Sequence, residues 1–207
     1  MTTPLETRED AYRDVIRSSG RIKMLLLLLV CAAPVIASYF TFYVIKPQGR
    51  INYGELILPV APLPAAPLRL LDGRPYDLAA LKGKWVLLTI DHGACAEPCV
   101  EKLYKMRQVR ATQGKDAERL ETAWLIDDEA QLETQVIRAY DGTHMLRAGG
   151  APVLKNFTPA AAPGADRHDH IYLIDPLGNL VLRYPKDADP QKMKRDLERL
   201  LRYSRIG

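Results

Sequence analysis

The stretch KWVLLTIDHGACAEPCVEKL, residues 84–103, joins a strand-like sequence directly to a helix-like one. Residues 84–90 form a largely apolar run, which is typical of a central strand buried on both faces. After the second cysteine, apolar residues recur at helical spacing through about residue 110, at Val100, Leu103, Tyr104 and Met106. Cys95 and Cys99 therefore stand at a predicted strand-to-helix junction.

The spacing of these two cysteines leaves three kinds of chemistry open. Residues four apart on a helix have Cβ atoms about 5–6 Å apart, wider than the roughly 3.8 Å of a relaxed disulfide, although a loop before the helix could close the gap. A helix N-terminus favours the thiolate that nucleophilic attack and metal binding both need. The pair could be a structural disulfide, a redox pair or two metal ligands, and Cu(I) accepts fewer ligands than a structural zinc ion.

The chain on either side of this junction alternates between strand and helix patterns. The sequence predicts a strand or hairpin limb ending at the Asp72-Gly73 turn, a strand at 122–126, a helix at 129–140, a β-hairpin with strands at 171–175 and 180–184, and an amphipathic helix at 190–205. Strand, helix, strand, helix, hairpin, helix is the order of a thioredoxin-like α/β domain. The chemistry of that fold usually lies at its first strand-to-helix junction, where the two cysteines stand.

The N-terminal part of the chain predicts a membrane anchor. Residues 24–45 carry no charge, and as a helix they would span roughly 30 Å, about the hydrocarbon thickness of a bilayer. The expected order is a cytoplasmic tail at 1–23, a transmembrane helix at 24–45, a Pro-rich linker at 46–67 and a thioredoxin-like domain at 68–207. A cleaved signal peptide is the rival interpretation, but the apolar stretch exceeds a usual signal core. Cys31, inside the span, is expected to be a small apolar filler.

Charge gives the expected orientation and excludes one class of partner. More basic residues precede the span than follow it closely, which predicts a cytoplasmic N-terminus and a C-terminal domain outside, in the periplasm if the membrane is a bacterial inner membrane. The formal net charge is +4 over 207 residues, and no basic run is interleaved with aromatics, so nucleic acid is a poor candidate partner.

The histidines are the candidate third donors beside the two thiols. His168 and His170 lie at the end of a long loop and the start of the predicted hairpin, a point that in a thioredoxin-like fold lies next to the N-terminus of the first helix. His92, three residues before Cys95, could be an extra ligand or a proton shuttle, but a solvated loop residue is the main expectation. His144 is expected to be a surface residue. The long loop, residues 149–166, is expected to be a flap that positions the histidine and closes on metal binding.

Four stretches resemble the Sco/SenC family of membrane-anchored copper proteins: RLLDGRPYDLAALKGKWVLLTI, CAEPCVEKLYKM, WLIDDE and HIYLIDPLGNLVLRY. The resemblance spans about residues 68–203. It implies a thioredoxin-like domain behind a single membrane span, with one copper ion, Cu(I) in the first instance, bound by the cysteine pair and a distant histidine. It also implies a role in the assembly of cytochrome c oxidase, with the copper-bearing subunit and other assembly factors as partners.

Carried over residue by residue, the resemblance assigns Cys95 and Cys99 as copper thiolates and matches Glu97 and Asp127 to acidic positions of the family. The family histidine lies five residues before the tyrosine of the hairpin strand, whereas His168 lies four and His170 two residues before Tyr172. Both stay candidates, because the pleat decides whether His170 points at the thiols or away.

Three functions follow as hypotheses. The first is a copper-binding protein that delivers copper to a cytochrome c oxidase, or prepares its thiols, during assembly. The second is a periplasmic thiol-disulfide oxidoreductase that uses Cys95 and Cys99 as a catalytic pair, with Cys95 as the nucleophile. The third is an assembly scaffold that no longer binds copper.

Overall fold

The computed structural model describes residues 4–41, 43, 52–159, 164–204 and 206 of the chain. The chain forms two compact units, Met1–Arg50 and Ile51–Gly207. The first unit contains helix α1, Pro4–Phe40, within which Ile22–Phe40 is long and apolar enough to cross a membrane, by length and composition. An anchor and a signal sequence both satisfy that test. The last part of the span expected at 24–45 lies largely outside the described residues.

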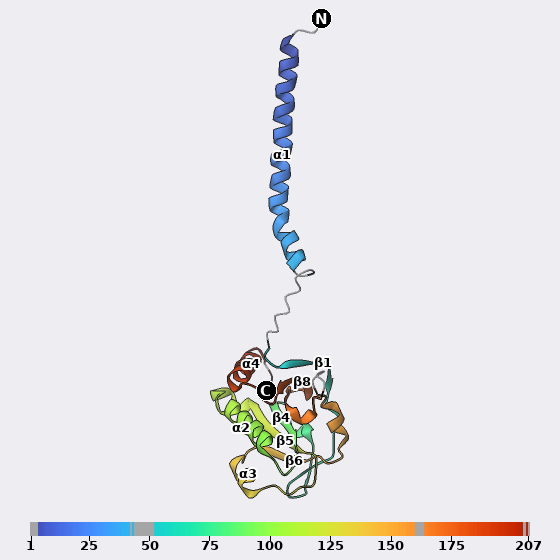
Figure 1. The fold of residues 1–207 in the computed structure, drawn as a ribbon, viewed down its shortest axis with the longest axis vertical. Helices are drawn as coiled ribbons and strands as arrows, with labels where there is room; N and C mark the ends of the chain where they lie inside the picture. The colour runs from blue at the N-terminus through green and yellow to red at the C-terminus, as the bar shows by residue number, and fades with distance from the viewer. Residues whose placement is uncertain (1–3, 42, 44–51, 160–163, 205, 207) are drawn as a thin grey trace. The chain divides into compact units, whose positions relative to one another are not determined.

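The second unit is built on one mixed sheet of eight strands in the order β1-β8-β7-β4-β5-β6-β2-β3 (Figure 1). The strands are β1 Glu55–Pro62, β2 Leu68–Leu70, β3 Pro75–Tyr76, β4 Trp85–Asp91, β5 Leu120–Ile126, β6 His144–Arg147, β7 His170–Ile174 and β8 Asn179–Pro185. β5 runs parallel to both β4 and β6, while β7 is antiparallel to β4 and forms a hairpin with β8. This mixed α/β arrangement confirms the predicted thioredoxin-like fold.

Two apolar layers cover the sheet, and β4 contributes alternate side chains to each. On one face, helices α2 (Glu97–Ala111) and α4 (Pro190–Tyr203) pack side by side over Leu87 of β4 (Figure 1). We call this the helix face. On the other face, Leu88 packs with residues of the 3-10 helices η2 (Leu78–Leu81) and η4 (Pro152–Asn156). We call this the loop face. All seven residues of β4 are buried, as its apolar sequence predicts.

The prediction of a Pro-rich linker at 46–67 is wrong over part of its length. Residues 55–62 form strand β1, which pairs antiparallel with β8 at the edge of the sheet. Prolines stiffen an extended chain, and an edge strand tolerates them because its outer N–H groups need no partner. An extended Pro-rich segment is thus equally compatible with a spacer and with an edge strand. Residues 46–51 lie outside the described residues.

The prediction of a flap at 149–166 is also wrong over the first half of that segment. Val153, Leu154 and Phe157, within and just after η4, belong to the apolar core on the loop face. Phe157 is 2% exposed and its ring packs edge-on against that of Tyr172, with centroids 5.0 Å apart. A segment that buries three apolar side chains is part of the core, so it cannot open without exposing them. Residues 160–163 lie outside the described part of the chain.

Two further elements differ from the sequence predictions. The helix expected at 129–140 forms only as α3, Thr134–Ala139, because residues 127–133 make a loop. His144, expected at the surface, begins strand β6, where it is partly buried and its ring lies 5.9 Å from that of Tyr76. β6 itself was not predicted, since its four residues, HMLR, are too few to show an alternating pattern.

Candidate functional site

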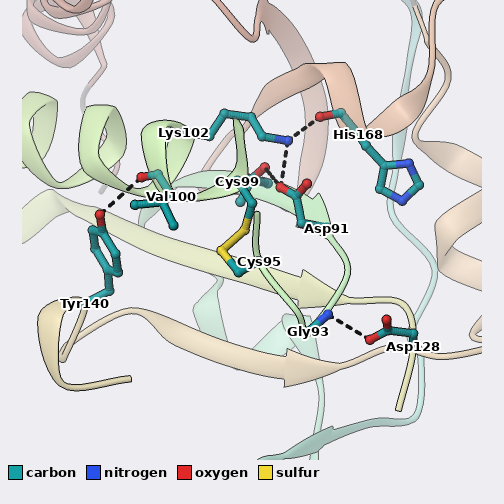
Figure 2. Close-up of a disulfide and its surroundings, with 10 residues drawn as sticks. Asp91, Gly93, Cys95, Cys99, Val100, Lys102, Asp128, Tyr140 and His168 are labelled. Atoms are coloured by element: carbon teal, nitrogen blue, oxygen red, sulfur yellow. Dashed lines mark hydrogen bonds and ion pairs between the residues drawn. A yellow bond between two sulfur atoms is a disulfide. The ribbon is translucent and has the colours of Figure 1, made fainter. Parts of the chain in front are cut away.

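Cys95 and Cys99 form a disulfide at the N-terminus of α2 (Figure 2). Cys95 lies outside the helix, just before the N-cap residue Ala96, and has a left-handed backbone with φ of 30°. Few non-glycine residues adopt that conformation. It turns the chain into the helix so that the two Cα atoms stand 5.1 Å apart. The loop before the helix therefore closes the gap that a regular helical turn would leave.

A buried ion pair lies next to this disulfide. Lys102, one turn after Cys99, is 1% exposed and its Nζ lies 2.6 Å from Oδ2 of Asp91, the last residue of β4. The Thr89 hydroxyl lies 3.2 Å from the same carboxylate oxygen. Burial raises the pKa of the Asp91 carboxyl, and the Lys102 ammonium opposes that rise. Figure 2 shows this carboxylate between the disulfide and His168.

His168 is held by two carboxylates, one at each ring nitrogen. Its Nε2 lies 2.8 Å from Oδ2 of Asp127, which follows β5, and its Nδ1 lies 2.5 Å from Oδ1 of Asp166. Asp166 also caps the 3-10 helix η5, Arg167–Asp169, by accepting a hydrogen bond from the His168 backbone N–H. The imidazole is therefore oriented by its own loop and by the end of a core strand.

His92 completes this group, although its place in the sequence predicts a solvated loop residue. Its side chain is 64% exposed, yet its Nδ1 lies 2.9 Å from Oδ1 of Asp127, and its ring centroid lies 4.8 Å from that of His168. One carboxylate therefore bridges the two imidazoles. The signal for this contact was in the fold: β4 and β5 are parallel neighbours, so the residues just beyond their carboxyl ends meet at one edge of the sheet.

His168 is tied to both flanks of the cysteine segment. On the N-terminal flank it packs against His92, three residues before Cys95. On the C-terminal flank lies Lys102, three residues after Cys99. Its ammonium donates a hydrogen bond to the His168 carbonyl. The structure thus brings His168 to the same end of the sheet as the disulfide.

His170 lies elsewhere. It shares the pleat of β7 with Tyr172, which belongs to the loop-face core, and the two rings meet edge-on with centroids 5.8 Å apart. Leu173, on the opposite pleat, belongs to the core under α2 and α4. Burial lowers the pKa of the His170 imidazole. The side chain of His170 is therefore on the face of the sheet that α2 does not cover, and the structure does not bring it to the cysteines.

Gly93 is the point where the cysteine loop touches the loop after β5. Its N–H donates to Oδ1 of Asp128 at 2.8 Å (Figure 2). A Cβ placed on Gly93 would lie 2.4 Å from the carbonyl oxygen of Ala130, closer than non-bonded atoms approach. Only glycine fits this close backbone contact, which sets the position of His92 relative to Asp127.

We expect Gly93→Ala to separate the two loops and to lower the free energy of unfolding by about 1–3 kcal/mol, the usual cost of overpacking. Thermal or urea unfolding of the full chain in detergent measures this. Gly149→Ala is the matched control, because its added Cβ meets the flexible end of Glu129 at 3.3 Å and the backbone oxygen of Asp127 at 3.6 Å, which is an ordinary contact. Equal stability of the two variants would show that the backbone at Ala130 can move away from the added Cβ at little cost in free energy.

Comparison with known proteins supports the fold at two levels. Residues 85–204 match the family model described as "Transmembrane-like, thioredoxin-like, C-terminal domain". No curated protein sequence matches the chain. Among solved structures, ScoI of Bradyrhizobium japonicum with copper bound is 22% identical, with a TM-score of 0.50 over 67% of this chain and 99% of that one. Yeast Sco1 with copper bound is 19% identical, with a TM-score of 0.54 over 70% of this chain and 90% of that one.

A third similar structure is BsSco, described as a member of the Sco family of cytochrome c oxidase assembly proteins in which a disulfide switch was identified. It is 14% identical, with a TM-score of 0.50 over 72% of this chain and 99% of that one. At such identities the likeness to the Sco structures shows a common fold. The family model covers more than half of the sequence, including the disulfide and His168. The chain therefore belongs to the family of transmembrane-like proteins with a thioredoxin-like C-terminal domain.

Proposed function

We propose that this chain is a membrane-anchored copper-binding protein which, with its cysteines reduced, binds one Cu(I) ion through Cys95, Cys99 and His168. One observation carries the proposal: His168 is tied to both flanks of the cysteine segment, through the ring of His92 and the ammonium of Lys102. The imidazole lies at the same end of the sheet as the two sulfurs, with the Asp91 carboxylate between them, so after reduction the cysteine loop and His168 would have to move together to form a three-donor set.

The chemistry of these donors suits copper as cargo. The two thiolates are soft ligands that favour Cu(I), the imidazole also suits copper, and three ligands fall short of the four that a structural zinc ion takes. The disulfide must first accept two electrons and two protons from a dithiol partner, which becomes a disulfide itself. Cu(I) then replaces the thiol protons as it binds, and it leaves by stepwise exchange to the soft ligands of an acceptor.

The destination and the membrane location are part of the same proposal. The likeness to BsSco, from a family of cytochrome c oxidase assembly proteins, supports a copper-bearing oxidase subunit as acceptor. The apolar segment Ile22–Phe40 would be the single anchor, in a bacterial inner membrane, with the N-terminus cytoplasmic and the thioredoxin-like domain periplasmic. Reoxidation of the cysteines suits that oxidising compartment, and their reduction there requires the dithiol partner.

A second function, thiol-disulfide oxidoreductase, is favoured by the disulfide itself. Cys95 is more exposed than Cys99, so an incoming thiolate would attack the sulfur of Cys95 and form a mixed disulfide, with the sulfur of Cys99 as leaving group. A second thiolate of the same partner then releases Cys95, and the partner leaves oxidised. The same reaction run backwards would prepare the thiols of an oxidase subunit for copper.

The test is a Cu(I) titration of the full chain in detergent, against a chromogenic Cu(I) chelator under a non-thiol reductant. A Cys31→Ser background removes the remaining cysteine, a free thiol in the apolar helix. We expect one Cu(I) per chain, at least a 100-fold loss of affinity in Cys95→Ser and Cys99→Ser, and a 10- to 100-fold loss in His168→Ala. His170→Ala is the matched control and should bind as the parent does.

Two results would overturn the copper proposal. One is an absence of Cu(I) binding by the reduced chain. The other is binding that His168→Ala leaves intact and His170→Ala abolishes. Rapid reduction of insulin disulfides by a chain that ignores Cu(I) would establish the oxidoreductase function instead.

A further inference from the structure

We propose that His92, Asp127 and His168 form a second metal site, which binds a divalent transition-metal ion such as Zn²⁺ while Cys95 and Cys99 are joined as a disulfide. A disulfide offers no thiolate, so the oxidised chain has only nitrogen and oxygen donors at this end of the sheet. Two imidazoles and a carboxylate are ligands for borderline cations, among them Zn²⁺ and Cu²⁺. The site is distinct from the Cu(I) set except that His168 belongs to both.

The geometry places three ligand atoms around one point. One nitrogen of each histidine and one oxygen of Asp127 all lie within 4.8 Å of one another. Nδ1 of His92 and Nε2 of His168 approach the two oxygens of the same carboxylate, at 2.9 Å and 2.8 Å. A metal ion would lie about 2.0–2.2 Å from each donor, and at Nε2 of His168 it would replace the hydrogen bond to the Asp127 carboxylate.

The support around these ligands is already in place. The carboxylate of Asp166, 2.5 Å from Nδ1 of His168, leaves Nε2 as the nitrogen that faces Asp127. A carboxylate on the far nitrogen of a ligating histidine fixes the tautomer and strengthens the ligand. On the other side, Oδ1 of Asp128 accepts hydrogen bonds from the N–H groups of Gly93 and Ala130, and these hold the loops that carry His92 and Asp127 together.

Access favours binding of an ion from solution. The side chain of His92 is 64% exposed and that of His168 is 24% exposed, whereas Asp127 is nearly buried between them. An ion would reach the two imidazoles directly, and water would complete its coordination shell, as in zinc sites with three protein ligands. Because His168 is shared, a chain that holds the divalent ion must release it before His168 can complete the Cu(I) set.

The test uses the oxidised full chain in detergent, in the Cys31→Ser background, titrated with Zn²⁺ against a chromogenic zinc chelator. We expect one Zn²⁺ per chain and at least a 10-fold loss of affinity in His92→Asn and in Asp127→Asn. Asp166→Asn, which changes only the support of His168, should weaken binding 10- to 100-fold. His144→Asn is the matched control, because His144 is partly buried at the start of β6, outside this cluster, and its loss should not change affinity.

Replacing Zn²⁺ by Co²⁺ gives a second readout, because the visible spectrum of Co²⁺ reports nitrogen and oxygen ligands without sulfur. The proposal would be overturned if the oxidised chain binds no Zn²⁺. It would also be overturned if the His92→Asn variant binds Zn²⁺ with the same affinity as the parent. The Cu(I) titration of the reduced parent chain is independent of the Zn²⁺ titration of the oxidised parent chain. The failure of the zinc site and the failure of the copper proposal are therefore separate results.

Discussion

Lys102→Met is expected to lower the free energy of unfolding by about 3–5 kcal/mol at neutral pH. The side chain is 1% exposed, its ammonium pairs with Asp91 at 2.6 Å, and it also donates to the His168 carbonyl. Methionine fills a similar volume, so the loss comes from a buried carboxylate left without its counter-charge rather than from a cavity. Urea unfolding of the full chain, followed by tryptophan fluorescence, measures the change.

The free energy of unfolding that Lys102→Met loses relative to the parent should become smaller as the pH falls. Burial raises the pKa of the Asp91 carboxyl already in the parent, and removing the ammonium that opposes this rise raises it further. A carboxyl whose pKa is higher in the folded chain than in the unfolded chain favours folding only while it is protonated. Acidification toward that raised pKa therefore restores part of the lost stability. A deficit that stays constant with pH would contradict this explanation.

Lys105→Met is the matched control for the site. Lys105 is also buried in α2, but it pairs with the exposed Glu101 at 2.8 Å and donates to the carbonyl of Lys186 at 2.8 Å. Neither partner contacts His168 or the disulfide in the interactions described. Both variants should be destabilised, and only Lys102→Met should also weaken Cu(I) binding, because only Lys102 ties His168 to α2. Equal losses of Cu(I) affinity in the two variants would show that Lys102 does not position His168.

The strand-to-helix junction at residues 84–103 could be predicted because its information is local. A buried strand is apolar throughout, and the helix that follows repeats its apolar residues at helical spacing, so neither depends on distant contacts. The predictions failed where pairing decides the structure. β1 is a strand only because β8 offers it an edge, and the segment 152–157 is core only because it packs under Tyr172.

The candidate site divides in the same way. Cys95 and Cys99 could be placed at the strand-to-helix junction from the local strand and helix patterns. The choice between His168 and His170 could not, because a one-residue change in where β7 begins moves a side chain to the other face of the sheet. The contact of His92 with Asp127 required the knowledge that β4 and β5 are parallel neighbours, and nothing within the sequence DHGAC specifies that pairing.

Phe157→Ala should be the most destabilising alanine substitution within residues 152–159, costing about 3–5 kcal/mol. The side chain is 2% exposed and meets the ring of Tyr172 edge-on, so its removal leaves a cavity in the loop-face core and forfeits an aromatic contact. Leu177→Ala, at a hairpin turn where the leucine is 61% exposed, is the control and should change stability by less than about 0.5 kcal/mol. Thermal and urea unfolding of the full chain measure both.

This prediction also separates two ways in which His168 can be positioned. If residues 152–157 acted as a flap that closes on metal, Phe157→Ala would weaken metal binding while leaving the metal-free chain about as stable as the parent. If they are core, as the burial of Val153 and Phe157 requires, the metal-free chain itself is destabilised. At temperatures where the variant is still folded, its metal affinity should then equal that of the parent. His168 would in that case be positioned by Asp166, Asp127 and Lys102, all fixed before any ion arrives.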